Sequence, residues 1–273
     1  MNASDRGAAD RLRRAYDAVA PDYDRQMSGD AWMRQVLWDH YLRRFRPGQR
    51  VLDVSCGTGT DAIFLAQHGI SVVGIDLSPG MIAALREKVA AAKVADRVQG
   101  HVLDFAELAS WHTTRFDGII SAFAGLNGVA DLRPFAASAA RILGPGSHLI
   151  VHLLSRWSLW EALGLVAHGE WEQARDLGRR RERTFSVGGT EIRQYPFNPD
   201  ETYRRFFFPW FHLERAYGLG IFRPPHTVRR IPAPLIAALG LVESGARNLP
   251  WLRGLGRLFV LDLVRRTDLV ERG

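Results

Sequence analysis

A carboxylate and two glycines stand close together in residues 51–60, where they could bind a charged small molecule. Asp53 lies near the end of a short apolar run, and Gly57 and Gly59 follow it in a predicted turn. Glycines at such a turn let a ligand approach the backbone closely. The helix expected after the turn offers free backbone N–H groups at its first residues. A second carboxylate, Asp76, ends the next apolar run.

Two cofactors fit this pattern differently. Gly57, Gly59 and Ala62 match the G-x-G-x-x-A fingerprint of dinucleotide binding, in which Asp76 would hold a ribose hydroxyl. A carboxylate at position 53 would repel the pyrophosphate of NAD. S-adenosylmethionine (SAM) has no phosphate, and its ammonium group would be attracted by the same carboxylate. The residue types therefore favour SAM and leave NAD as a weaker alternative.

Apolar runs and helical segments alternate along the first half of the chain and must position these residues. Helices are predicted at 8–20, 30–45, 61–68, 78–92 and 132–143, and strands at 50–55, 71–77, 98–103, 116–123 and 147–154. Strands that are apolar almost throughout indicate a parallel sheet covered by helices on both faces. We therefore predict an α/β fold with a Rossmann-like, doubly wound, mostly parallel sheet of seven strands.

The pattern changes after Ser155. The sequence predicts a helix at 157–168, a hairpin around Gly188-Gly189, a helix at 199–206, a strand at 211–222, a helix at 235–243 and a final strand at 258–264. We expect three parts: a cofactor-binding core with an N-terminal helical segment (1–155), a lid insertion that selects the substrate (156–230) and a segment that completes the core sheet (231–273).

Charge and cysteine content restrict the class of protein. The 273 residues carry a net charge of +7, and residues 156–273 account for +6 of it. This excess fits an anionic substrate, an anionic membrane surface or nucleic acid and does not choose among them. The single cysteine, Cys56, excludes an intrachain disulfide. A polar N-terminus and the lack of a long apolar run lead us to expect a cytoplasmic protein.

Five segments in a fixed order resemble the motifs of class I SAM-dependent methyltransferases, in particular the ubiquinone/menaquinone-biosynthesis-like methyltransferase domain. They are VLDVSCGTGT (51–60), GIDLSPGMI (74–82), VLDF (102–105), FDGIISAF (116–123) and RILGPGSHLIVHLL (141–154). The stretch from Tyr16 to Asp24 resembles the N-terminal segment that often closes over SAM. Ser55 departs from the family pattern, which usually has glycine there, so we expect a slightly altered turn.

The resemblance implies which residues hold the cofactor. Asp76 would accept hydrogen bonds from the ribose diol and Asp104 from the adenine amino group, with Phe105 against the ring. The full set of implied cofactor-binding residues is Tyr23, Asp53, Ser55, Gly57, Gly59, Asp76, Leu77, Met81, Asp104, Phe105 and Ser121. The methyl group would point toward the C-terminal ends of the fourth and fifth strands. The candidates for lining the acceptor site there are Asn127, His152 and Ser155.

We expect methyl transfer from SAM to a small, largely apolar metabolite, with or without an anionic group, and S-adenosylhomocysteine as the product. No spacing of His, Cys and Asp fits a metal, and no catalytic base can be named. RNA or protein methylation and SAM binding without activity remain alternatives. No nucleic-acid-binding module is recognisable, so nucleic acid is a disfavoured partner. Weak membrane association and the oligomeric state stay open, although the helix at 157–168 lacks a basic face.

Overall fold

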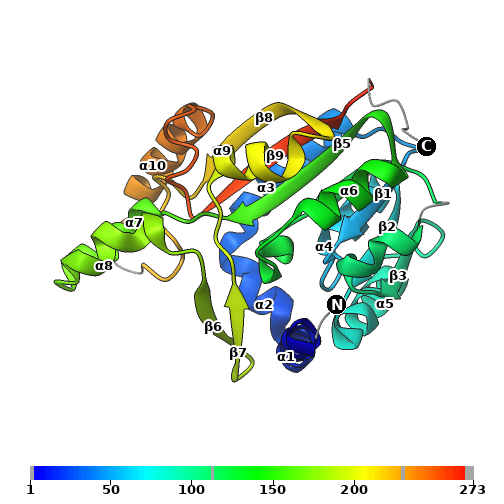
Figure 1. Cartoon of the computed structure of the whole chain (residues 1–273), viewed down its shortest axis with the longest axis horizontal. Helices are drawn as coiled ribbons and strands as arrows, with labels where there is room; N and C mark the ends of the chain where they lie inside the picture. Colours follow the sequence, from blue (N-terminus) through cyan, green and yellow to red (C-terminus); the bar gives the residue numbers. More distant parts are fainter. Residues whose placement is uncertain (1–2, 112–113, 229–230, 268–273) are drawn as a thin grey trace.

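A seven-stranded mixed sheet forms the centre of the protein (Figure 1). The computed structural model describes residues 3–111, 114–228 and 231–267. The strands are β1 (Arg50–Val54), β2 (Ser71–Asp76), β3 (Val98–Val102), β4 (Phe116–Ser121), β5 (Leu143–Leu154), β8 (Phe211–Leu219) and β9 (Leu258–Arg265), in the spatial order β3-β2-β1-β4-β5-β9-β8. Strands β1 to β5 run parallel, whereas β9 is antiparallel to both β5 and β8. The predicted doubly wound α/β sheet is confirmed.

Helices cover both faces of the sheet, as its apolar strands require. They are α3 (Ala31–Arg44), α4 (Thr60–Gln67) and α5 (Pro79–Ala91) on one face and α6 (Arg133–Ile142) on the other. Alternate residues of β1 point into the hydrophobic cores on opposite faces of the sheet. Val51 packs in the core with α3 and α4, whereas Leu52 and Val54 pack in the core with α6. Asp53 is two residues from Val51 and therefore points to the same face of the sheet, which places its carboxylate on the face covered by α3 and α4.

The strand order reverses at β1. Strands β2 and β3 lie on one side of β1, and β4 and β5 lie on the other. Open α/β sheets bind ligands beyond the carboxyl ends of their strands at such a reversal, because the connecting helices diverge there to opposite faces. The glycine turn follows β1 and therefore opens into this crevice.

The described part of the predicted insertion, residues 156–228, forms an extension and also contributes to the sheet. The extension comprises α7 (Leu159–Ala167), α8 (Trp171–Asp176), the hairpin of β6 (Arg183–Val187) and β7 (Thr190–Gln194), and α9 (Pro199–Thr202). The predicted hairpin turn at Gly188-Gly189 is confirmed. Strand β8 lies within the range predicted for the lid insertion, yet it pairs with the side of β9 that β5 leaves free and so extends the core sheet. After this strand the chain forms α10 (Ala233–Ala246).

The hairpin lies against the N-terminal helix α1 (Ala3–Val19), as Figure 1 shows at the lower edge of the molecule. A Cβ on Gly188 would come within 2.9 Å of the Ala15 carbonyl oxygen and of the Ala18 Cβ. Only glycine permits this approach of the two backbones. The contact joins two segments that are far apart in the sequence.

A buried charge network fixes α3 to the antiparallel half of the sheet. Asp262 on β9 accepts hydrogen bonds from His40 Nε2 (2.9 Å), Arg44 Nε (2.7 Å) and His148 Nδ1 (2.7 Å). Burial raises the pKa of this fully buried carboxyl, but the hydrogen bonds from His148 and His40 outweigh it and hold the pKa well below its usual value. His148 thus has a structural role in the sheet.

Candidate cofactor site

The turn after β1 has a left-handed backbone. Ser55, Gly57 and Gly59 have φ angles of 57°, 54° and 76°. A Cβ on Gly59 would lie 2.6 Å from Cγ of Leu85 on α5, so glycine is required there by both the backbone angle and the packing. Ser55 adopts a left-handed conformation, which glycine adopts more readily than a residue with a side chain. The departure from the family pattern therefore falls on a left-handed residue.

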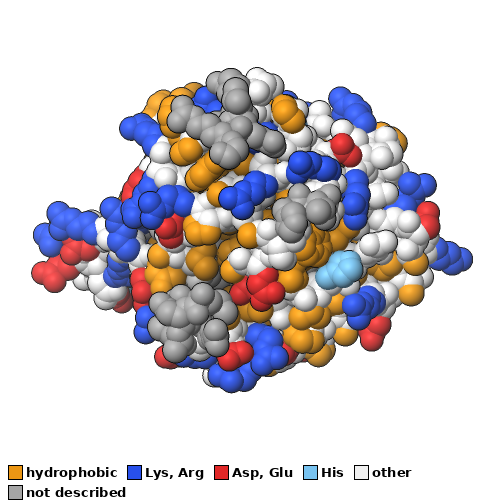
Figure 2. Space-filling view, turned by 45° about the vertical axis from the view of Figure 1, so that its right-hand side comes forward, with side chains coloured by type: hydrophobic (Ala, Val, Ile, Leu, Met, Phe, Trp, Pro, Cys, Tyr) orange, Lys and Arg blue, Asp and Glu red, His pale blue; other side chains and the backbone are white. Residues whose placement is uncertain are grey.

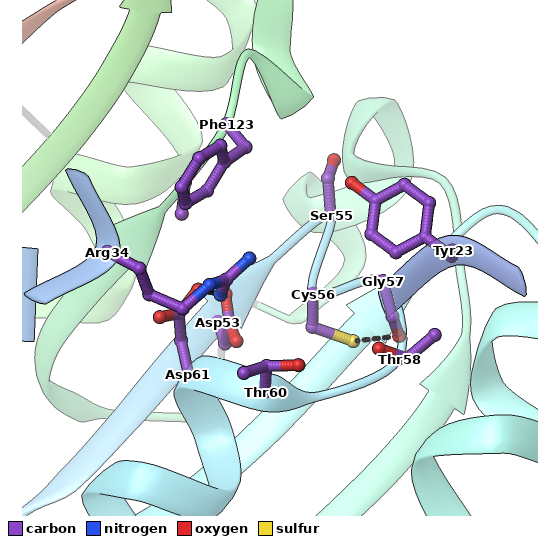
Figure 3. Close-up of a pocket in the computed structure, with 11 residues that line it drawn as sticks. Tyr23, Arg34, Asp53, Ser55, Cys56, Gly57, Thr58, Thr60, Asp61 and Phe123 are labelled. Carbon is purple, nitrogen blue, oxygen red and sulfur yellow. Dashed lines mark hydrogen bonds and ion pairs between the residues drawn. The ribbon is translucent and has the colours of Figure 1, made fainter. Parts of the chain in front are cut away.

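Two adjoining cavities border this turn and share Tyr23, Ser55, Gly57 and Phe123 as walls. Polar and charged side chains dominate the first cavity, which is drawn in Figure 3. The second cavity extends from the turn toward β2 and the N-terminal helix. Together they form a continuous surface around the C-terminal ends of β1, β2 and β4.

Asp76 at the end of β2 holds the turn and faces the second cavity. Its carboxylate oxygens accept hydrogen bonds from the backbone nitrogens of Gly57 and Ser78, each at 2.9 Å. Burial raises the pKa of Asp76, and these backbone hydrogen bonds oppose the shift. Each carboxylate oxygen has two lone pairs, so Asp76 retains acceptor capacity for a ribose diol.

A second group of charges lies on the other side of the turn (Figure 3). Asp53 is 1% exposed, and its Oδ2 has no hydrogen-bond partner among the described residues. Asp61 on α4 accepts hydrogen bonds from Arg34 Nη1 and Trp38 Nε1. Burial, followed by the charge of Asp61, raises the pKa of Asp53 well above its usual value. The Arg34 guanidinium lies 4.4 Å from the ring centroid of Phe123, which fixes the cation at the cavity wall.

These groups fit the methionine end of SAM. A buried carboxylate oxygen without a partner is costly and gains most from a cationic ligand such as an ammonium group. A guanidinium has five N–H donors, so Arg34 can bind a ligand carboxylate while it remains paired with Asp61. Asp53 and Arg34 border the same cavity, which matches a ligand that carries both charges on one carbon.

Two carboxylates pin the N-terminal segment over the glycine turn. Asp17 on α1 accepts hydrogen bonds from Ser78 Oγ (2.6 Å) and from the backbone nitrogen of Gly80 (2.9 Å), at the start of α5. Asp24 on α2 (Tyr23–Met27) accepts hydrogen bonds from Thr58 Oγ1 (2.6 Å), Thr60 Oγ1 (3.2 Å) and Lys88 Nζ (2.6 Å). The N-terminal segment at residues 16–24 thus contacts both the turn after β1 and the turn between β2 and α5.

Two tyrosines of this segment line the second cavity. The ring centroids of Tyr16 and Tyr23 are 6.4 Å apart in an edge-to-face arrangement. Burial, with a smaller contribution from the charge of Asp76, raises the pKa of Tyr16 to about 12. Burial also raises the pKa of Tyr23 above its usual value. Both hydroxyls therefore stay protonated at neutral pH and can donate hydrogen bonds to a ligand.

The residues predicted at the adenine end lie beside β2. Leu103 N donates to the carbonyl oxygen of Asp76 (2.9 Å), which brings the turn after β3 next to the ribose position. Asp104 Oδ1 accepts from the backbone nitrogen of Ala106 (2.9 Å). The ring centroid of Phe105 lies 5.9 Å from that of Phe135 on α6. Neither Asp104 nor Phe105 borders the two cavities, so their adenine contacts stay a prediction.

Three further residues of the predicted cofactor set lie around these strand ends. Met81 on α5 is 1% exposed and lines the second cavity. Leu77 directly follows Asp76 and is partly buried. Ser121 ends β4, and its buried Oγ has no hydrogen-bond partner among the described residues. The carbonyl oxygen or ammonium of a ligand could satisfy this hydroxyl, but its role stays a prediction.

Asn127 joins two segments that are distant in the sequence, and its acceptor-lining role stays a prediction. Its side chain is fully buried. Nδ2 donates to the carbonyl oxygen of Tyr195 (2.7 Å), and Oδ1 accepts from the backbone nitrogen of Leu154 (3.1 Å). Both ends of the amide are therefore used to join the chain after β7 to the end of β5. The sequence could not show this, because the partner backbone comes from the extension.

His152 and Ser155 are each 1% exposed and border neither cavity beside the turn. His152 Nδ1 accepts from the backbone nitrogen of Phe123 (3.2 Å). Burial, with the charges of Arg257 and Arg34, lowers the pKa of His152 to about 3. The imidazole is therefore neutral at physiological pH and orients Phe123. The acceptor-lining roles of His152 and Ser155 stay predictions that would require a change in the surrounding chain.

Arg34 and Phe123 are the site residues that sequence reasoning missed. Arg34 lies on α3, whose apolar residues predict a buried face and give no signal for a cation at the site. Phe123 lies at the end of the predicted fourth strand and adopts a left-handed backbone angle of 49°. The sequence signal that could have identified Arg34 was its place as a cation on the predicted helix that precedes the glycine turn. Among the described residues, no group of three His, Cys, Asp or Glu side chains could hold a metal ion.

Comparisons with known proteins agree with this geometry. The family model described as "Methyltransferase domain" matches residues 51–146. The chain is 28% identical over 205 residues to the demethylmenaquinone methyltransferase of Symbiobacterium thermophilum, covering 70% of this chain and 80% of that protein. It is 31% identical over 151 residues to the ubiquinone/menaquinone biosynthesis C-methyltransferase UbiE of Geobacter sulfurreducens, covering 52% of this chain and 57% of that protein. The chain thus spans little more than half the length of this second relative.

A solved structure shares the whole architecture. The structure of the DhpI–SAH complex superposes with a TM-score of 0.59 at 15% identity, covering 96% of this chain and 98% of that one. At this identity the likeness shows the fold alone. The sheet order, the glycine turn and the family match together define a class I SAM-dependent methyltransferase domain. Residues 51–146 thus carry a methyltransferase domain, and the curated proteins to which the chain is similar include demethylmenaquinone methyltransferases.

Proposed function

We propose that this chain transfers the methyl group of SAM to a small, largely apolar acceptor. The observation that carries the proposal is the position of Asp53 beside the cation of Arg34 at the glycine turn; the buried Oδ2 of Asp53 has no hydrogen-bond partner among the described residues. This pair suits the zwitterionic methionine end of SAM, and Asp76 suits its ribose. The names of the relatives support an acceptor with an apolar ring system.

SAM supplies an already activated methyl group when bound, so the protein mainly contributes position and exclusion of water. Asp53 and Arg34 would orient the methionine end, and Asp76 would fix the ribose. Asp17 and Asp24 would hold the N-terminal segment over the cofactor and keep water out. Tyr16 and Tyr23 stay protonated and would donate hydrogen bonds, since their raised pKa values prevent them from acting as bases at neutral pH.

The first test is calorimetric titration with SAM and with S-adenosylhomocysteine. The wild-type protein should bind both, and Asp76→Ala should abolish binding. Asp131→Ala is the control, because Asp131 forms a surface pair with Arg133 outside the site. Wild-type protein that binds neither ligand would refute the proposal. Incubation of the active protein with labelled SAM and lipid extracts would then identify the acceptor.

Methylation of RNA is the second candidate, because the C-terminal half carries the charge excess. Figure 2 shows that, on the face drawn there, Lys and Arg side chains are scattered among acidic ones and do not form one continuous patch. A nucleic-acid site would show saturable, salt-dependent RNA binding. Absence of such binding at low salt would exclude this candidate.

A further inference from the structure

Helix α10 has an inverted burial pattern. Its 14 residues, APLIAALGLVESGA, include a single charged side chain, Glu243, and this is the helix's buried residue. The apolar side chains face outward: Leu235 and Val242 are each 50% exposed, and Leu241 is 78% exposed. A surface helix normally buries its apolar side chains and exposes its charges. This arrangement needs a partner that is itself apolar.

Glu243 fixes the helix in this orientation. Its Oε1 accepts from the backbone nitrogen of Gly220 (2.8 Å), and its Oε2 accepts from those of Ile221 (3.0 Å) and Phe222 (2.8 Å). A carboxylate that accepts several backbone N–H groups is strongly held. The apolar face of α10 is therefore turned outward by a specific buried contact and does not result from loose packing.

The chain that follows the helix carries further exposed apolar side chains. Residues after α10 add Leu249 (39% exposed) and Trp251 (72% exposed). Exposed leucine, valine and tryptophan side chains within one short segment mark an interaction surface, whereas isolated exposed apolar residues do not. We define Leu235, Leu241, Val242, Leu249 and Trp251 as the α10 surface.

The charge around the α10 surface selects the partner. In the sequence, residues 215–257 contain seven arginines and one carboxylate, the buried Glu243; two of these arginines, Arg253 and Arg257, pair with Asp200 and Asp30 from outside the segment. A second copy of the chain would bring the same positive charge to the interface and be repelled. An anionic lipid surface would attract Arg215, Arg223 and Arg247, which have no ion pair among the described residues, and would accept the apolar side chains between its headgroups. No described helix is long and apolar enough to cross a membrane, and an interfacial helix does not need to be.

We propose that the α10 surface binds the interface of an anionic lipid bilayer, with α10 lying in the membrane plane. Trp251 would sit at headgroup level, where indole rings concentrate. The segment before α10 connects this surface to the cofactor site. Arg223 lies 4.7 Å from the ring centroid of Trp32 on α3, the helix that carries Arg34. The binding itself does not depend on methyl transfer.

Sedimentation with lipid vesicles tests the proposal without SAM. The wild-type protein should sediment with vesicles of equal parts phosphatidylglycerol and phosphatidylcholine, and less with vesicles of phosphatidylcholine alone. Binding should weaken as salt is added, because ions screen the arginines. The double variant Leu241→Gln, Val242→Gln should bind at least about tenfold more weakly, since two apolar side chains no longer enter the bilayer.

The matched control is the double variant Val102→Gln, Phe208→Gln. These side chains are 48% and 53% exposed and lie on β3 and after α9, outside the α10 surface. The control should bind vesicles as the wild type does. Thermal melting of both variants checks that they are folded.

Equal vesicle binding by the wild type and the α10 variant would overturn the proposal. A wild-type dimer in sedimentation velocity that the α10 variant dissociates, with no vesicle binding, would also overturn it and assign the surface to a second copy.

Discussion

Asp53→Asn should weaken SAM binding and at the same time stabilise the protein without ligand. The Asp53 carboxylate is 1% exposed, one of its oxygens has no partner among the described residues, and Asp61 lies nearby as a second negative charge. In the absence of ligand this charge is an uncompensated cost. In the complex it is the partner of the ligand's ammonium group. The two effects therefore have opposite signs, which a purely structural role for Asp53 would not produce.

The size of the binding effect follows from the charge-assisted hydrogen bond. Such a bond contributes about 1.5–3 kcal/mol, which corresponds to about 10- to 150-fold weaker binding when it is lost. The pKa of Asp53 is raised in the folded protein, so this carboxyl releases its proton at a lower pH in the unfolded protein than in the folded one. Wild-type stability should thus fall as the pH rises above the ordinary aspartate value, and the variant should lack this fall.

Calorimetry with SAM and thermal melting across pH measure both effects. The ammonium group favours the ionised carboxylate, so SAM binding to the wild type should release a proton and strengthen as the pH rises. Asp131→Asn, at a surface carboxylate paired with Arg133, is the matched control for SAM affinity, which it should not change. Unchanged SAM affinity in Asp53→Asn would refute the assignment of Asp53 to the ammonium group. Reduced stability of the variant without ligand would refute the argument from uncompensated charge.

Three further predictions follow from the contacts of named residues. Arg34→Gln should weaken SAM at least about tenfold but leave 5′-methylthioadenosine, which has no carboxylate, nearly unaffected in competition titrations; equal losses would contradict its assignment. Asp24→Ala should accelerate SAM dissociation in stopped-flow experiments, because it frees α2 from the turn, and an unchanged rate would exclude a closing role. Asp262→Asn should lower the free energy of unfolding by about 3–5 kcal/mol in urea titrations, since it leaves His40 and His148 without their buried anion. The Asp262 contribution, present above the ordinary aspartate pKa, should be lost as the pH falls below it, and a variant as stable as the wild type would refute this.

The order of strands and helices could be predicted because each depends on local pattern. Apolar runs of strand length separated by helical segments define a doubly wound sheet whatever the details of packing. The Gly188-Gly189 turn was predictable for the same reason, since few residue pairs adopt the required backbone angles. The place of β8 in the sheet was not predictable, because a strand at 211–222 can pair with the sheet or with the insertion at equal local cost.

The candidate site likewise contains some residues that local sequence patterns predict and others that they do not. Asp53, Gly57, Gly59 and Asp76 lie within 24 residues, and their types and spacing alone predict a turn that binds a charged cofactor. The role of Asn127 could not be read in this way, because its two hydrogen-bond partners are backbone atoms of distant segments.

The sequence by itself determined the fold class, the glycine turn and the kind of cofactor, because these depend on short-range patterns and on charge. Only the tertiary structure brought Arg34 from α3 beside Asp53 and Phe123. Only the tertiary structure also turned the apolar face of α10 outward, since the burial of Glu243 depends on the backbone of residues 220–223. A helical pattern specifies which residues share a face, but the neighbours that the fold provides decide which face is buried.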